Sequence, residues 1–302
     1  MMARTGLGRI RTGLAEFSTS NQWRKLRPVL FSMAVILFAL IWFAPIFWII
    51  SISFKPNSVA ALYPVTWIPR PFTLENYETI LLHPTRGVNI VRSFGISAFV
   101  CSAVVGGVLL LSTPAAYAFA RLKFRGRDTI FWLMVATLAL PVQMFIVPVY
   151  VILDRVDWVN TLKALIFPPL GPAFALFVLR QFMLAVSTET EEAARLDGCN
   201  RLQVLWYVVV PQIRPALVSV GLITFLSTWN DFLWPLIVIY DRDIYPLTLA
   251  LNDVRSAYHF TFEAGTVMAS YVVAVVPVVV LFYFAKNHLI RGISLTGTGS
   301  TM

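Results

Sequence analysis

The stretch Val29–Ser53 reads VLFSMAVILFALIWFAPIFWIISIS and contains no Lys, Arg, Asp or Glu. About 20 consecutive apolar residues are enough for a helix to cross the roughly 30 Å of hydrocarbon in a bilayer, so this stretch predicts a transmembrane helix. Basic residues precede it, as in a secretory signal peptide, but the run is too long for a signal-peptide core and lacks a small-x-small cleavage site. We therefore expect it to remain as the first span.

Five further apolar stretches predict five more spans. They are Phe94–Ala120, Ile130–Leu153, Leu162–Leu184, Ala216–Ile239 and Gly265–Ala285. The whole chain of 302 residues is 58% hydrophobic and 13% charged, whereas ordinary soluble domains carry about 25% charged residues. Prolines within or beside these runs are compatible with membrane helices and with the broken helices of transporters. The expected fold class is all-α, a polytopic membrane protein with six transmembrane helices.

The basic residues predict the orientation of the spans. About two thirds of the 24 Lys and Arg residues flank the spans on the side of the N-terminus, so the positive-inside rule places both termini in the cytoplasm. These residues form short clusters between apolar runs and no continuous basic face. The net charge of +9 therefore gives no support for a nucleic-acid partner.

The sequence offers no catalytic or metal centre. Cys101 lies in an apolar run and Cys199 in a polar loop, which suits neither a disulfide framework nor metal-ligand spacing. A Walker A site needs Gly-Lys-Ser/Thr to bind phosphates, and none of the lysines follows a glycine. We expect no enzyme activity and no cofactor on this chain, so any ATP hydrolysis would require a partner.

The polar loop between the fourth and fifth predicted spans reads TETEEAARLDGCN from Thr188 to Asn200. It predicts a short helix at about 189–198. Thr188 and Glu191 have the spacing of a capping box, and Glu191 and Arg195 form an i,i+4 pair of favourable orientation. Gly198 suits the left-handed residue that ends a helix.

Within this loop, Glu192-Ala193-Ala194 is followed by Gly198, Val208, Val210 and Pro211. This order resembles the EAA loop of ABC importer permeases, whose pattern is Glu-Ala-Ala, three residues, Gly, nine residues, Ile, one residue and Leu-Pro. The spacing matches throughout, with Val in place of Ile and of Leu. Glu-Ala-Ala alone is a common helical tripeptide, so the Gly, the Pro and the six-span context carry the resemblance.

Other stretches resemble the carbohydrate-uptake permeases of the maltose-system (MalG-like) type. They are AAYAFAR at Ala115–Arg121, LRQF at Leu179–Phe182, WNDFLWPL at Trp229–Leu236, and Arg291-Gly292. The resemblance implies a type I (MetI-like) ABC importer permease fold in a prokaryotic plasma (inner) membrane. It also implies import of a di- or oligosaccharide by ATP-driven alternating access. Glycerol-phosphate permeases share much of this pattern.

The resemblance also implies a division of the chain and a set of partners. Residues 1–28 would be a cytoplasmic tail, 29–285 the six-span permease domain with its EAA coupling loop at 188–215, and 286–302 a second cytoplasmic tail. The loop would dock on a separate ATPase dimer, which would hold ATP and Mg. A second permease subunit, forming a heterodimer, and an extracytoplasmic sugar-binding protein would complete the assembly. The docking residues would be Glu192, Ala193, Ala194, Asp197, Gly198 and Pro211.

Asp231 is the carboxylate placed well inside a predicted span, with Trp229 and Asn230 beside it. Burying an ionisable group in a membrane is costly, so such a residue is by default a functional hypothesis. Together with Trp234, the three residues supply hydrogen-bonding groups and aromatic faces for a possible substrate path. Alternatively, Asp231 caps a helix break or pairs within the bundle.

Three other functions remain open. One is an ABC permease for glycerol phosphate or a polyamine; an anionic solute would require basic residues facing the path, and the middles of the predicted spans carry none. Another is an ion-coupled secondary carrier, which usually needs several buried carboxylates or histidines. The third is an intramembrane enzyme, but His83, His259 and His288 all fall outside the predicted spans.

Overall fold

The computed structural model describes the backbone of residues 6–62, 66–84, 87–258 and 263–296, and side chains between residues 27 and 286 within these ranges. The described residues form helices and short helical turns, without a strand, which confirms the all-α expectation. Three of the described helices are long and apolar enough to cross a membrane. Up to six spans result if each of three bent helix pairs counts as one.

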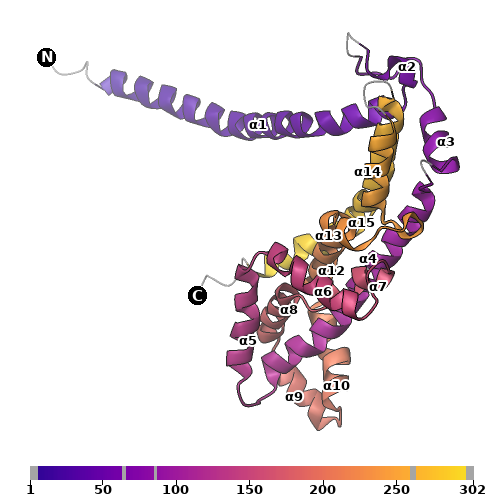
Figure 1. Ribbon diagram of the computed structural model, residues 1–302. Coiled ribbons are helices and arrows are strands. Elements are labelled where there is room, and N and C mark those ends of the chain that lie inside the picture. Colours follow the sequence, from indigo (N-terminus) through magenta and orange to yellow (C-terminus); the bar gives the residue numbers. More distant parts are fainter. Residues whose placement is uncertain (1–5, 63–65, 85–86, 259–262, 297–302) are drawn as a thin grey trace.

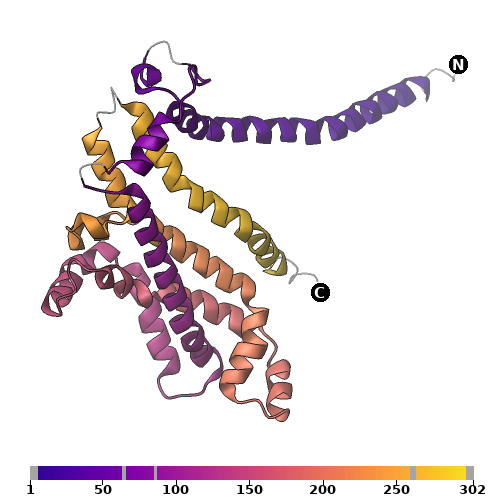
Figure 2. The ribbon, with the colours of Figure 1, turned by 90° about the vertical axis from the view of Figure 1, so that its right-hand side faces the viewer.

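The first span belongs to one long helix, α1 (Gly6–Ser53), which projects away from the rest of the protein (Figures 1 and 2). No residue of the hydrophobic window in the portion from Arg27 onward is buried. Among the side chains of α1 that the structure describes, the packed ones lie at its C-terminal end, where Ile52 joins an apolar cluster with Ala264 and Met268 of the last helix.

The two expected tails are partly helical. Residues 6–28 continue α1 without interruption, and the last helix, α15 (Ala264–Thr296), runs well past residue 286. Residues 1–5 and 297–302 lie outside the described residues, as does His259, and the side chains of Arg291 and His288 are not described.

The helix α4 (Ile90–Arg121) lies at the centre of the bundle and contains the predicted span at 94–120. Val100, Val104 and Val108 are buried along it, at the four-residue spacing that aligns side chains on one helix face. The helices α8 (Ala173–Ala185) and α12 (Arg214–Trp229) pack against α4, and α15 packs against α12.

The predicted span at 130–153 is not one helix, because the chain bends by 100° at Leu140–Pro141. Proline has no backbone N–H and disfavours the helical conformation at the residue before it. Leu140 accordingly has φ −87° and ψ 128°, an extended conformation. The segments on either side are α5 (Arg127–Ala136), η1 (Thr137–Ala139), η2 (Val142–Phe145) and α6 (Ile146–Arg155).

The predicted span at 162–184 is also bent, by 41°. It consists of α7 (Leu162–Ile166), the turn η3 (Pro168–Leu170) and α8, with Gly171 and Pro172 at the bend. Pro168, Pro169 and Pro172 have no backbone N–H to donate, so a regular helix cannot continue through this segment.

The prediction of a span at 216–239 is wrong in its second half. The helix α12 ends at Trp229, and a separate short helix, α13 (Leu233–Val238), follows. The Asp231 carboxylate accepts a hydrogen bond from the Trp234 N–H at 3.4 Å. Asp231 therefore lies at a break between two helices, where its side chain bonds to the start of the second.

The chain before α12 is helical as well, and it meets α12 at 81°. It comprises α10 (Arg201–Gln203), the π-helical turn η4 (Val204–Val209) and α11 (Val210–Gln212). Val204, Leu205 and Val209 are buried, so this segment connects the polar loop to the core of the bundle.

The end of the molecule opposite this loop is built from the remaining short helices (Figure 1). They are α2 (Asn57–Ala60), α3 (Glu75–Leu82), η5 (Arg242–Ile244) and α14 (Leu247–Ala257). The Asn76 amide donates to the backbone oxygens of Ser53, at 2.9 Å, and Lys55, at 2.7 Å. A Cβ atom on Gly265 would lie 2.6 Å from the Asn76 amide nitrogen, so the glycine allows the start of α15 to approach α1 and α3.

Lys55 is buried within this end of the molecule. Its amine donates to the backbone oxygen of Thr66 and lies over the Trp48 ring, 5.3 Å from the ring centroid. Desolvation lowers the pKa of the Lys55 amine from its ordinary value.

Candidate functional site

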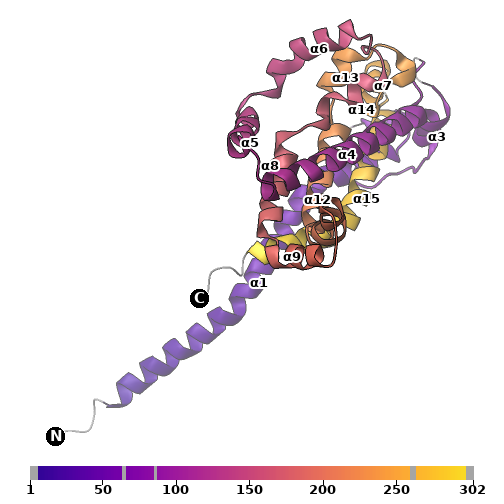
Figure 3. The same ribbon diagram turned by 90° about the horizontal axis from the view of Figure 1, so that it is seen from below.

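The polar loop after α8 folds into two short helices at one end of the molecule, the end that Figure 3 shows from below. The first, α9 (Thr188–Leu196), covers most of the expected helix, and Gly198 follows it with φ +90°. This confirms the prediction that Gly198 has a left-handed conformation after the helix. Asn200 and Gln203 then form a reciprocal capping box that starts α10. We call residues 188–203 the loop tip.

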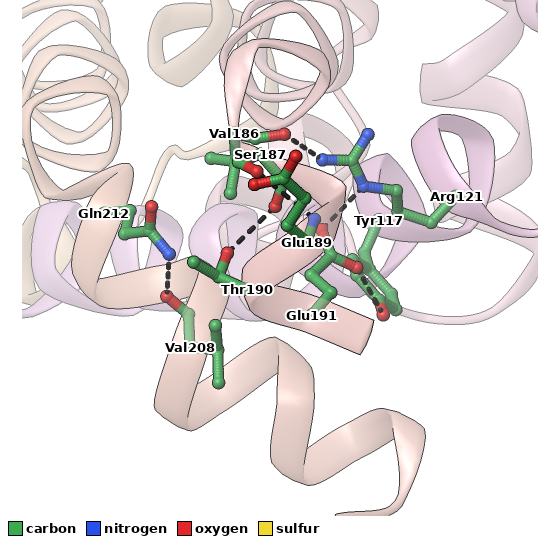
Figure 4. A network of polar contacts seen from close by, with 9 residues as sticks. All are labelled: Tyr117, Arg121, Val186, Ser187, Glu189, Thr190, Glu191, Val208 and Gln212. Atoms are coloured by element: carbon green, nitrogen blue, oxygen red, sulfur yellow. Dashed lines mark hydrogen bonds and ion pairs between the residues drawn. The ribbon is translucent and has the colours of Figure 1, made fainter. Parts of the chain in front are cut away.

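The N-terminal cap of α9 differs from the expected one. The Glu189 N–H donates to the Ser187 hydroxyl at 3.2 Å, and the Thr190 hydroxyl donates to the Ser187 carbonyl at 2.9 Å (Figure 4). Ser187, one residue before Thr188, is therefore the cap. The predicted capping box of Thr188 and Glu191 is wrong, because the Glu191 side chain turns toward another helix.

Glu191 is bound to the last turn of α4 (Figure 4). The Arg121 Nε donates to the Glu191 Oε1 at 2.6 Å, and the Tyr117 hydroxyl donates to the Glu191 Oε2 at 3.3 Å. A second nitrogen of Arg121 donates to the backbone oxygen of Val186 at 2.6 Å. Glu191 thus pairs with Arg121, where the sequence had predicted Arg195.

The residues expected to dock on a partner lie mainly at the surface of the loop tip. Ala194 is half-buried and packs against the apolar core of the bundle. The exposed ones are Glu192, Ala193, Asp197, Gly198 and Pro211. The adjacent glutamates of α9 thus point in different directions, Glu191 inward and Glu192 outward.

Three large side chains of the same region are strongly exposed, and no motif had marked them. Leu196 is 89% exposed, Leu202 63% and Tyr207 77%. Grouped exposed apolar side chains mark interaction surfaces. The sequence did contain one indication of this surface: two leucines, Leu196 and Leu202, in an otherwise polar loop. A surface that contacts only solvent does not require leucine.

A cavity of about 620 Å³ lies between the broken spans. Asp231 is the charged residue in its lining; Gln143, Ser227 and Thr228 are polar, and the Trp234 ring supplies an aromatic face. The other lining residues are Val142, Phe145, Ile146, Val149, Leu165, Pro168, Pro169 and Leu233. The volume and the mainly apolar lining with a few polar groups are typical of a small-molecule site.

The structure separates the residues expected to form a substrate path. Trp229 is buried between Phe94 and Phe225, and its indole donates to the Ala274 backbone oxygen at 3.1 Å. Asn230 is exposed and donates to the Leu226 backbone oxygen at 2.8 Å. Neither is in the cavity lining.

Asp231, by contrast, lines the cavity together with Trp234, as the sequence had predicted. Gln143, which comes from a different broken span, also lines it and had not been predicted. The Trp234 indole donates to the Ala164 backbone oxygen at 2.9 Å, which fixes its ring at the wall of the cavity.

Within the described residues, no group of three or more His, Cys, Asp or Glu side chains is placed to hold a metal ion. Cys101 is buried and Cys199 half-buried, and both are free thiols.

Comparison with known proteins places residues 109–295 in the family described as "binding-protein-dependent transport system inner membrane component". The chain is 30% identical over 279 residues to the arabinooligosaccharides transport system permease protein AraQ of Halalkalibacterium halodurans, covering 91% of this chain and 98% of AraQ. It is 30% identical over 234 residues to the sn-glycerol-3-phosphate transport system permease protein UgpE of Yersinia pestis, covering 76% of this chain and 83% of UgpE.

A solved structure shares the fold. It is a chain from the crystal structure of a bacterial ABC transporter involved in the import of the acidic polysaccharide alginate. The TM-score is 0.77 at 22% sequence identity, and the match covers 87% of this chain and 96% of the other.

Proposed function

Because this chain belongs to the family of binding-protein-dependent transport system inner membrane components, we propose that it moves a di- or oligosaccharide into the cell by ATP-driven alternating access. It is a membrane subunit of an ABC transporter for sugars, without catalytic activity of its own, and the ATPase is a separate chain. The type I (MetI-like) permease fold expected from the sequence is confirmed by the family and by the structural neighbour.

The observation that carries the proposed mechanism is the surface of the loop tip. Ala193 is small and exposed, so a partner can approach the backbone of α9 closely, while Leu196 offers an apolar side chain to bury. A buried leucine contributes about 1.5–3 kcal/mol. Glu192 and Asp197 would pair with basic or polar groups of the ATPase, and Pro211 would stiffen the return of the chain to α12.

The cavity beside Asp231 favours a neutral, hydroxyl-rich solute. A carboxylate and neutral polar groups accept hydrogen bonds from sugar hydroxyls, and the Trp234 ring offers an apolar face to a sugar ring. Among the described residues, the lining includes no basic side chain, so a phosphate group entering the cavity would meet the Asp231 charge without a compensating cation from them. UgpE is nevertheless a relative, so glycerol phosphate is the second candidate.

The assembly proposed for this chain has two permease subunits, an ATPase dimer and an extracytoplasmic sugar-binding protein in a prokaryotic inner membrane. Both termini would lie in the cytoplasm, which places the loop tip on the side of the ATPase. The exposed apolar window of α1 supports a second subunit, because a helix that leaves its own bundle can pack against a neighbour. A heterodimer is the proposed form.

The substrate proposal predicts a specific effect of Asp231→Asn. Loss of a hydrogen bond to a charged group is worth about 1.5–3 kcal/mol, so we expect the KM for the imported sugar to rise roughly tenfold or more. The measurement is uptake of a labelled arabino-oligosaccharide, glycerol 3-phosphate and putrescine by proteoliposomes containing the whole transporter with its binding protein.

Asp154→Asn is the matched control, because Asp154 is exposed and outside the cavity lining. Its uptake should equal that of the unaltered protein. Preferred uptake of glycerol 3-phosphate or putrescine would contradict the sugar assignment, and unchanged sugar uptake by Asp231→Asn would remove Asp231 from the path.

A further inference from the structure

The ion pair between Arg121 and Glu191 is more deeply buried than four other ion pairs between described residues. The Arg121 side chain is 11% exposed and that of Glu191 is 5% exposed. Several pairs elsewhere have at least one partner that is more than half exposed: Arg92–Asp243, Arg127–Asp128, Arg180–Asp128 and Arg242–Asp253. Exposed pairs contribute little, whereas removing one member of a buried pair leaves an uncompensated charge.

Arg121 joins three helices at one point. It ends α4, it donates to the Val186 carbonyl at the end of α8, and it pairs with Glu191 in α9. Tyr117, one turn earlier in α4, donates to the other oxygen of the same carboxylate. Tyr117 and Arg121 are four positions apart, so both side chains reach α9 from one face of α4.

The same helix reaches the neighbourhood of the cavity. Ser97, Val100 and Cys101 of α4 line a small space of about 20 Å³ together with Asp231 and Trp234. Helix α4 is continuous from Ile90 to Arg121, a distance of roughly 45 Å at 1.5 Å per residue. One continuous helix, with Pro114 inside it, therefore connects Glu191 at the loop tip to the walls around Asp231.

We propose that the buried Arg121–Glu191 pair transmits the movement of α9 to α4, and through α4 to the cavity. Glu191 and Arg121 are then positioning residues, and the neighbouring Glu192 is the one that faces the ATPase. This inference rests on the proposed function, because it assumes that an ATPase moves α9.

The test measures access to the cavity, which requires no knowledge of the sugar. In the assembled transporter, Cys101→Ser and Cys199→Ser remove the native thiols, and Gln143→Cys places a reporter in the cavity lining. The alkylation rate of this reporter by a maleimide is measured with and without ATP and vanadate, and ATPase retention is measured in the same samples.

With the pair intact, we expect ATP to change the alkylation rate at least fivefold. Glu191→Gln should retain the ATPase but reduce that response to less than twofold. Glu189→Gln is the matched control, because Glu189 is an exposed glutamate of the same helix and is not among the expected docking residues; it should retain the ATPase and preserve the response. The exchange Arg121→Glu with Glu191→Arg should restore more than half of the response, and it serves as the deciding variant if Glu191→Gln does not fold.

A full ATP response in Glu191→Gln would overturn the inference, as would loss of the ATPase from that variant or failure of the folded exchange variant to recover. Absence of any ATP response with the pair intact is a different result, since it would contradict ATP-driven alternating access itself.

Discussion

Replacing Leu196 with arginine is expected to release the ATPase from the transporter. Leu196 is 89% exposed at the end of α9, and burial of a leucine in an interface contributes about 1.5–3 kcal/mol. An arginine there would also bring a charge into an apolar contact, so we expect the affinity for the ATPase to fall roughly 100-fold. The measurement is the amount of ATPase that remains bound to the detergent-purified permease.

Leu82→Arg is the matched control, because Leu82 is 69% exposed at the end of α3, at the opposite end of the molecule (Figure 1). This variant should retain the ATPase fully. Equal retention by Leu196→Arg and Leu82→Arg would remove Leu196 from the docking surface.

The second large effect is expected at Gly198. Its φ of +90° is accessible to glycine, and its N–H donates to the Arg195 carbonyl at 3.0 Å. Proline fixes φ near −65° and has no N–H, so Gly198→Pro removes both the left-handed turn and the hydrogen bond. The loop tip would then be misplaced, and we expect sugar uptake to fall below a tenth of its original rate.

Gly198→Asn separates the backbone effect from the loss of a small residue. Asparagine adopts the left-handed conformation more readily than other residues with a side chain, and no atom lies within 4 Å of the Cβ position at Gly198. This variant should keep most of the uptake. If Gly198→Pro transported as well as Gly198→Asn, the turn at Gly198 would have no part in coupling.

The sequence predicted the loop tip well because its signals are local. The left-handed residue at Gly198 and the helix before it depend on a few adjacent residues, and both are confirmed. The separation of Glu191 from Glu192 could not be predicted in the same way. The partner of Glu191 is Arg121, which lies far away in the sequence, so its inward orientation appears only when α9 packs on α4.

The apolar runs predicted where the chain is hydrophobic but not where it bends. Long helices at 90–121 and 264–296 contain the spans expected there, because no helix break divides either apolar run. At Pro141 and Asp231 the same kind of run is divided. A proline can kink a helix or break it, and the choice depends on the neighbouring segments that satisfy the freed backbone groups.

The residues of the candidate cavity were predicted only in part for a related reason. Trp229 and Asp231 are two positions apart, so the sequence grouped them, but the end of α12 directs Trp229 into the packing with α15 and leaves Asp231 at the cavity. Gln143 reaches the same cavity from another broken span. Nothing in the local sequence around position 143 indicates that Gln143 lines the same cavity as Asp231.

We expect this chain to work as one permease subunit in a complex driven by a separate ATPase. The most direct measurement is purification of the chain from its native membrane in mild detergent, with mass spectrometry of the proteins that co-elute. We expect an ATPase and a second multi-span permease, in a ratio of two ATPase copies to one of each permease. A folded chain that elutes without any ATPase, under conditions that preserve other membrane complexes of the same cells, would contradict the account.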